Sequence, residues 1–158
     1  PGAESVLVTV SGSLEGLERQ LRELRPAAVD GADGTLEIPV VYDGADLDEV
    51  AELTGMGREE VIARHSSAEY TVAYLGFSPG FGYLTGLDPV LRVPRHDTPR
   101  TAVPAGSVAI AGPYTSVYPS ASPGGWRLLG RTSTVLWDVR RDPPSLLGPG
   151  TRVRFQPI

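Results

Sequence analysis

The sequence predicts a mainly β protein with a few helices near its front. Short alternating or β-branched runs, such as Thr35–Tyr42 and Tyr70–Leu75, are typical of strands. In the second half, turn residues recur about every ten positions, which is the spacing of a barrel or sandwich. The stretch from Gly76 to Gly130 contains 9 glycines and 8 prolines but also many apolar anchors. It is therefore a specified, loop-rich part of the fold, where binding sites tend to lie.

The first 33 residues form a strand–helix piece that is too small to fold alone. Val6–Val10 predicts a short strand. Ser13 is a candidate N-cap for a helix whose leucines recur at helical spacing, and Pro26 ends it. We expect a main domain over residues 34–158.

Two helices are expected early in the main domain. Asp46 and Glu49 have capping-box spacing before the first, and Gly55 ends it. Arg58–His65 predicts the second. Pro39 places its strand at a sheet edge. Five further strands are expected at Ser107–Ala111, Thr115–Tyr118, Trp126–Leu129, Thr134–Val139 and Thr151–Gln156.

Composition excludes several kinds of chemistry. The chain has neither cysteine nor lysine, so disulfides, thiolate metal sites, a Walker lysine and lysine-linked biotin or pyridoxal are ruled out within it. No apolar run approaches a membrane span. We expect a cytoplasmic protein with no membrane contact.

Charge is distributed unevenly along the chain. Residues 1–70 carry 15 acidic residues and 5 arginines, whereas residues 71–158 carry 4 and 9. The cationic, aromatic half suits an anionic small molecule or an acidic partner. An uneven but merely solvated surface explains the same numbers. Nucleic acid is disfavoured, because the arginines are dispersed and the whole chain is acidic.

The motif Gly76-Phe77-Ser78-Pro79-Gly80 has the G-x-S-x-G pattern of a nucleophile elbow. The residue after the serine is a proline, which has no N–H for an oxyanion hole. We therefore interpret the motif as a turn that presents Phe77 and Phe81.

The only two histidines give no metal-binding motif, so no metal site is expected. His65 lies at a helix end, where the helix dipole favours an imidazolium. His96 lies in a proline-bounded loop between Arg95 and Asp97 and is either catalytic or simply exposed.

Two Pro-Arg pairs in this loop, at Arg95 and Arg100, hold guanidinium groups on stiffened backbone. Such a pair is suited to a carboxylate or phosphate, although two surface arginines are the plain alternative. Gly124-Gly125 follows a proline and is either an anion-cradling nest or a tight turn.

Several blocks, in order, resemble one family. They are Gly76-Phe77-Ser78-Pro79-Gly80-Phe81-Gly82-Tyr83-Leu84, Pro94-Arg95, Pro99-Arg100, Val103-Pro104-Ala105-Gly106-Ser107-Val108, Tyr118-Pro119 and Ser122-Pro123-Gly124-Gly125-Trp126. The chain is identified as a member of the carboxyltransferase-domain, subdomain C and D family. That family includes allophanate hydrolase subunit 1, the KipI kinase inhibitor and the B-type subunit of 5-oxoprolinase (PxpB). Tyr114 departs from the glutamine usual there.

The resemblance implies a cyclophilin-like β-barrel over residues 34–158, preceded by the tail of a small α/β N-terminal subdomain over residues 1–33. It also implies a subunit 2 protein of the KipA/PxpC kind as partner, with a LamB/YcsF-type subunit as a further candidate. The chain alone would then be inactive. No covalent cofactor is expected, and ATP, with or without Mg, would act in the assembled complex.

The resemblance leaves the activity open among ATP-dependent opening of 5-oxo-L-proline, inhibition of a sensor histidine kinase, and biotin-dependent carboxyl transfer to urea. For an enzyme, the candidate catalytic residues are His65, Tyr83 and Arg100. The candidate substrate or anion-binding residues are Arg95, Arg100, Gly106, Ser107, Thr115, Tyr118, Gly124 and Gly125. For a kinase-binding module, the candidate partner-binding residues are Phe77, Pro79, Phe81 and Pro104.

Overall fold

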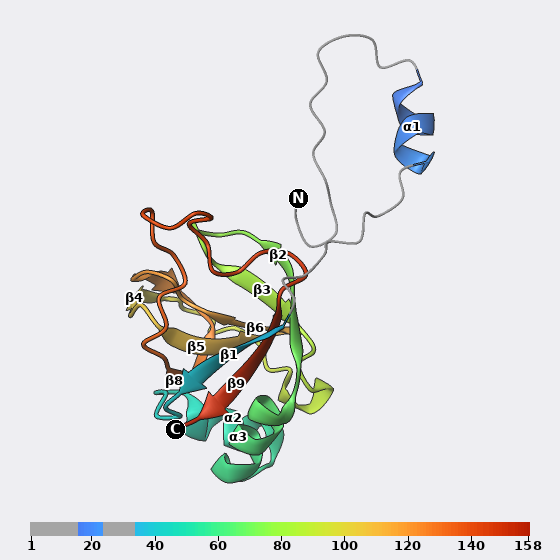
Figure 1. The fold of residues 1–158 in the computed structure, drawn as a ribbon. Coiled ribbons are helices and arrows are strands. Elements are labelled where there is room, and N and C mark those ends of the chain that lie inside the picture. The colour runs from blue at the N-terminus through green and yellow to red at the C-terminus, as the bar shows by residue number, and fades with distance from the viewer. Residues whose placement is uncertain (1–15, 24–33) are drawn as a thin grey trace.

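The computed structural model describes residues 16–23 and 34–158, and Figure 1 shows their arrangement. The helices are α1 (Leu17–Glu23), α2 (Leu47–Thr54), α3 (Arg58–Ser67) and the short 3-10 turn η1 (Pro89–Leu91). The strands are β1 (Thr35–Val40), β2 (Tyr70–Leu75), β3 (Gly82–Thr85), β4 (Arg100–Val103), β5 (Ser107–Ala111), β6 (Tyr114–Val117), β7 (Ser122–Gly124), β8 (Arg127–Arg131) and β9 (Arg152–Pro157). The expected mainly β fold with few helices is confirmed. The strand predicted at Val6–Val10 lies outside the described residues.

Seven strands form one sheet in the order β1-β9-β2-β3-β6-β5-β8, and this sheet curls into a nearly closed barrel (Figure 1). β1 runs parallel to β9, and it ends the sheet order as Pro39 predicted. The seam between β1 and β8 is closed just past β1. There, Val41 and Arg131 exchange two backbone hydrogen bonds of 2.9 Å.

Alternating side chains of the sheet build two cores. On β5, Val108 and Ile110 face the main core, whereas Ala109 and Ala111 face a second cluster that also contains Val103 of β4. β4 and β7 pair as a separate two-stranded sheet. The second cluster is rich in aromatic rings, and it underlies the candidate site described below.

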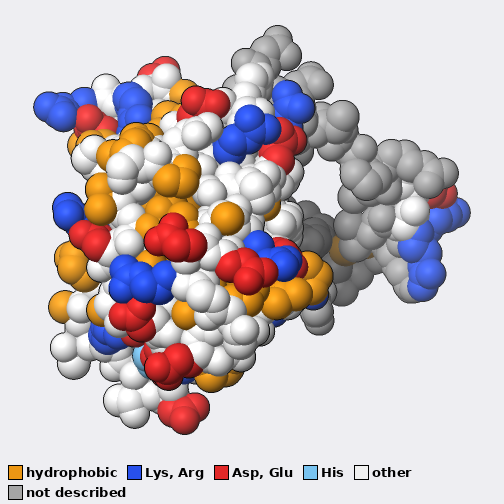
Figure 2. Space-filling view, turned by 90° about the horizontal axis from the view of Figure 1, so that it is seen from below, with side chains coloured by type: hydrophobic (Ala, Val, Ile, Leu, Met, Phe, Trp, Pro, Cys, Tyr) orange, Lys and Arg blue, Asp and Glu red, His pale blue; other side chains and the backbone are white. Residues whose placement is uncertain are grey.

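Helices α2 and α3 contact each other and cover one end of the barrel, with α3 against β9 and α2 against β8 (Figure 1). Gly55 ends α2 in a left-handed conformation, with φ at 68°, as its position predicted. The exposed side of this end carries interspersed acidic and arginine side chains (Figure 2), of which Arg58–Asp48 and Arg64–Glu60 are ion pairs.

The predicted capping box is wrong. Asp46 precedes α2, but its side chain makes no capping hydrogen bond. Its carboxylate instead accepts a 2.7 Å hydrogen bond from the backbone N–H of Leu128 on β8. The tertiary partner therefore replaces the local one.

Strand predictions hold where β-branched or alternating residues run without interruption, and β2 and β5 have the expected bounds. The strand predicted at Thr134–Val139 is absent, and only an isolated bridge between Trp137 and Ser145 is found there. The reason is local: Asp138 accepts hydrogen bonds from the backbone and the guanidinium of Arg140, which turns the chain.

Candidate functional site

Two adjoining hollows lie over the second, aromatic cluster. The first, here called the aromatic hollow, has a volume of about 230 Å³. It is lined by Phe77, Phe81, Tyr83, Arg95, Pro99, Tyr118, Pro123, Gly124 and Trp126. The second, of about 330 Å³, is lined by Tyr83, Pro94, Arg95, Ala111, Gly112, Pro113, Tyr114 and Trp126. Tyr83, Arg95 and Trp126 belong to both, so Arg95 stands where the two hollows meet.

Edge-to-face aromatic contacts build the floor of the aromatic hollow. The ring of Phe81 lies 5.2 Å from Tyr118, 5.2 Å from Tyr83 and 5.5 Å from Trp126, between centroids. Phe81 and Tyr118 are almost completely buried. Such packing fixes the rings, and it gives a rigid apolar surface that suits a planar or ring-shaped ligand.

Phe77 is held in a conformation that non-glycine residues rarely adopt. Its φ is 68°, and 61% of the residue is exposed. The turn around it is closed by hydrogen bonds from the Ser78 N–H to the Gly76 carbonyl and from the Phe81 N–H to the Ser78 carbonyl. A strained, exposed aromatic residue at the edge of a hollow points to function more than to packing.

Arg95 makes no hydrogen bond or ion pair within the described part of the chain, and its side chain is exposed. The backbone around it is nevertheless fixed. The His96 N–H donates to the Gly125 carbonyl at 2.8 Å, and Arg127 Nε donates to the Pro94 carbonyl at 3.2 Å. A guanidinium on a fixed loop is thus free to receive an anion.

Arg100 combines a structural contact with an unused donor. Its Nη2 donates to Asp46 Oδ1 at 2.6 Å, while its Nη1 is buried and has no partner among the described residues. Burial raises the pKa of Tyr118, and both Arg95 and Arg100 oppose this rise, so the two cations act on the same hydroxyl. The expected convergence of Arg95 and Arg100 therefore has electrostatic support.

Gly124 and Gly125 let the backbone approach this site closely. A Cβ added to Gly124 would lie 2.3 Å from the Tyr118 hydroxyl oxygen. A Cβ on Gly125 would lie 3.4 Å from the His96 carbonyl and 3.7 Å from Arg95 Nε. Both glycines are required by close packing, and their predicted role as amide donors to an anion stays a prediction.

Several of the predicted site residues do not line either hollow. Ser107 and Thr115 are buried, and Thr115 Oγ1 donates to the Ala109 carbonyl. The Gly106 N–H donates to the Tyr118 carbonyl, and Pro104 is exposed nearby in the chain.

The predicted partner-binding residues are divided between surface and interior. Phe77 and Pro79 are exposed, whereas Phe81 is the buried floor of the aromatic hollow. Phe81 could therefore support a docking surface from below but could not itself form one.

His65 lies inside the main core, completely buried. Its Nδ1 lies 2.7 Å from the Tyr42 hydroxyl, and its Nε2 lies 2.9 Å from Thr115 Oγ1. Since Thr115 already donates to a carbonyl, it accepts from Nε2–H, and Nδ1 accepts from Tyr42. Burial lowers the pKa of His65 to about 3, so the expectation of an imidazolium at a helix end is wrong. Its contacts account for a structural role, not a catalytic one.

The buried imidazole gives a pH-dependent stability. Because the folded-state pKa lies below the unfolded value, the unfolded chain takes up this proton first. The contribution is complete above pH ~6.5 and is lost on acidification toward pH 3, at about 1.4 kcal/mol per pH unit. Denaturant unfolding across this range should show a shallower pH slope in His65→Gln than in the parent chain. Parallel curves would contradict this role.

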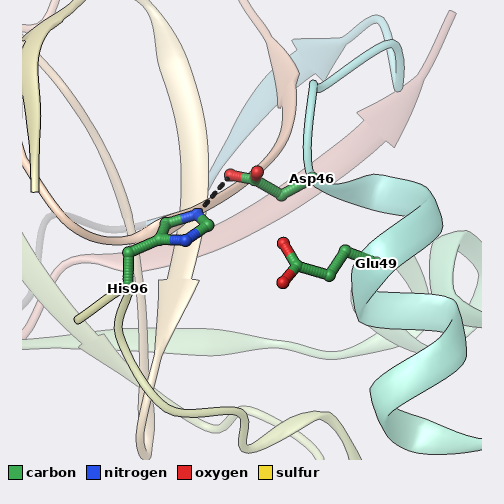
Figure 3. Close-up of side chains that lie close together, drawn as sticks. All are labelled: Asp46, Glu49 and His96. Carbon is green, nitrogen blue, oxygen red and sulfur yellow. Dashed lines mark ion pairs between the residues drawn. The ribbon is translucent and has the colours of Figure 1, made fainter. Parts of the chain in front are cut away.

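Asp46, Glu49 and His96 form a cluster that sequence reasoning missed, with ligand-type atoms within 4.8 Å of one another (Figure 3). The i, i+3 spacing of the two acids was visible, but it was interpreted as a cap. Each carboxylate contacts a guanidinium, Asp46 that of Arg100 and Glu49 that of Arg127. A divalent cation would have to displace both arginines, so the arrangement favours an ion-pair network over a metal centre.

None of the described helices has the length and apolar character needed to cross a membrane.

A nearly closed barrel with an arginine-bearing aromatic hollow on its outer face defines the class of the protein. Residues 1–147 match the family described as "Carboxyltransferase domain, subdomain C and D". The chain belongs to this family, as the resemblance of its sequence blocks indicated.

Curated relatives share this assignment. The chain is 47% identical to the B-type subunit of 5-oxoprolinase from Escherichia coli O157:H7, over 99% of this chain and 76% of that protein. It is 41% identical to the Bacillus subtilis (strain 168) protein of the same name, over 92% and 63%. The chain thus spans between 63% and 76% of the length of these two relatives.

Solved structures confirm the fold. TTHA0988 superposes with a TM-score of 0.80 at 46% identity, over 90% of this chain and 29% of that chain. PH0987 from Pyrococcus horikoshii gives a TM-score of 0.76 at 46% identity, over 78% and 59%. The similarity to K. lactis urea amidolyase is more distant, with a TM-score of 0.67 and 28% identity over 78% of this chain and 9% of that chain.

Proposed function

We propose that the chain is part of the B-type subunit of a 5-oxoprolinase, an enzyme that opens the lactam of 5-oxo-L-proline to L-glutamate with hydrolysis of ATP. The relatives that carry this name are 41% to 47% identical over 90% to 99% of the chain. The observation that carries the proposal is the unpaired Arg95 guanidinium, described above, at the rim of an aromatic hollow. The designation of these relatives as one lettered component of an enzyme supports action within an assembly, with a subunit 2 protein of the KipA/PxpC kind as the proposed partner.

The chemistry of 5-oxo-L-proline fits the aromatic hollow. The molecule is a five-membered ring with one carboxylate. Arg95 pairs with that carboxylate, and the ring lies against the rings of Trp126 and Tyr83. The hollow, at about 230 Å³, is small, as a ligand of this size requires.

Arg100 supplies the second cationic group. Its buried, unpartnered Nη1 is positioned to neutralise an anion, such as the phosphoryl group that ATP-dependent activation of the lactam oxygen generates. Tyr83 and Tyr118 line the same hollow and are proposed to orient the ligand. ATP, with or without Mg, is proposed to bind in the assembled complex.

A second candidate function is a binding module of the KipI kind, which docks on a sensor histidine kinase. The observation that favours it is the strained, 61% exposed Phe77 beside exposed Pro79. A pull-down with sensor kinases, comparing the parent chain with Phe77→Ala, tests this alternative. Capture that depends on Phe77 supports it, whereas no capture removes it.

Reconstitution tests the enzymatic proposal. The chain, with any sequence that precedes it in its gene, is co-expressed with the neighbouring subunit 2 protein, and ATP-dependent loss of 5-oxo-L-proline is measured. We expect turnover from the complex and none from either component alone. Urea carboxylation without 5-oxo-L-proline turnover would favour the urea amidolyase-like activity instead.

A further inference from the structure

Asp46 is a buried carboxylate held by three elements at once. Its side chain is 4% exposed. It accepts from Arg100 Nη2 at 2.6 Å and from the Leu128 N–H at 2.7 Å, and it lies 3.2 Å from His96 Nε2 (Figure 3). Burial works to raise its pKa, but these partners outweigh burial and hold the pKa below the usual range. Asp46 is therefore an anion in the folded protein.

These partners bracket the loop that carries Arg95. His96 follows Arg95 directly, and Arg100 lies where the loop enters β4. A second contact set comes from Arg127, which donates to the Pro94 carbonyl and contacts Glu49 on α2. The start of α2 is thus connected to both ends of the loop, although Asp46 lines neither hollow.

The same carboxylate also determines how Arg100 is oriented. With Nη2 fixed on Asp46, Nη1 stays buried and unpartnered among the described residues. An uncharged side chain at position 46 would leave the guanidinium without its counter-ion. Arg100 would then be free to turn, and the loop would lose its contact through His96.

We propose that Asp46 is a positioning residue of the anion site: its charge holds the Arg95 loop and the Arg100 guanidinium in place, so that carboxylate affinity depends on a group that never touches the ligand. The identity of the ligand rests on the proposed function. The dependence of Arg95 and Arg100 on Asp46 does not.

A double-mutant cycle separates positioning from general damage to the fold. The dissociation constant of 5-oxo-L-proline is measured in the assembled complex without ATP, for Asp46→Asn, Arg95→Gln and the double variant. We expect Asp46→Asn to weaken binding about 10-fold when Arg95 is present and less than about 2-fold when it is absent. Asp48→Asn, an exposed acid two residues along that pairs with Arg58, is the matched control and should bind like the parent. Equal losses in both backgrounds, or no loss, would overturn the proposal.

A second measurement needs no ligand. The side-chain Nε–H resonances of Arg95 and Arg100 are assigned by NMR from their loss in Arg95→Gln and Arg100→Gln. We expect Asp46→Asn to shift or broaden both, and Asp48→Asn to leave both unchanged. His96→Gln, which removes one contact only, should move the Arg95 resonance and serves if Asp46→Asn does not fold. A complex that fails to bind 5-oxo-L-proline contradicts the proposed function, while unmoved resonances in the positional variants contradict the role of Asp46.

Discussion

Replacing Gly130 with alanine is expected to open the barrel seam and to destabilise the protein by about 3 kcal/mol or more. A Cβ at this position would lie 2.3 Å from the Val41 carbonyl oxygen and 3.0 Å from the Tyr42 Cα. Both are backbone atoms, so no side-chain rotation relieves the clash. The neighbouring Val41–Arg131 pair closes the barrel through two hydrogen bonds, which the displaced backbone would lose.

Denaturant unfolding of Gly130→Ala against the parent chain measures this effect. Gly57→Ala is the control, because a Cβ at Gly57 meets no heavy atom within 4 Å and its φ is negative. We expect the control to stay within about 1 kcal/mol of the parent. An unchanged unfolding midpoint for Gly130→Ala would show that β1 and β8 are not held together at this seam.

Arg95→Gln is expected to lower kcat/KM for 5-oxo-L-proline about 10- to 100-fold in the reconstituted complex, with little change in stability. The loss follows from removing a charge-assisted hydrogen bond to the substrate carboxylate, which contributes about 1.5 to 3 kcal/mol. Stability is spared because Arg95 is exposed and has no partner among the described residues.

Arg92→Gln is the matched control for this effect. Arg92 is also exposed, lies three residues earlier in the chain and lines neither hollow. The complex that carries Arg92→Gln should turn over like the parent. If both variants lose activity equally, general surface charge explains the effect and Arg95 has no specific role.

Sequence patterns predicted the fold where local preference and tertiary packing agree. β2 and β5 were predicted with the correct bounds because their residues alternate or are β-branched and buried. β3, β4 and β7 were missed because they are three or four residues long and lie among glycines and prolines. These strands are fixed by pairing with distant segments, which a local pattern does not record.

The candidate site was predicted in part for the same reason. Phe77, Tyr83, Arg95, Tyr118 and Gly124 were singled out from the sequence, and the structure brings them together around one hollow. Polar residue type alone misplaced two others. His65 and Thr115 satisfy each other inside the core, since a buried imidazole needs partners whether or not it is catalytic.

Asp46 shows the limit of spacing rules most clearly. Its i, i+3 relation to Glu49 fits a capping box, but the Leu128 N–H and the Arg100 guanidinium compete for the same carboxylate oxygens and win. Those partners lie 82 and 54 residues away in the chain. Only the closed barrel brings them to the start of α2, so the ion-pair network becomes visible in three dimensions alone.

The most direct test is a structure of the assembled complex with 5-oxo-L-proline, prepared without ATP so that the ring stays closed. We expect the ring against Trp126 and Tyr83 and the carboxylate within about 3.2 Å of the Arg95 guanidinium nitrogens. A substrate bound elsewhere, with the aromatic hollow of this chain empty, would contradict the claim that this hollow is the substrate site.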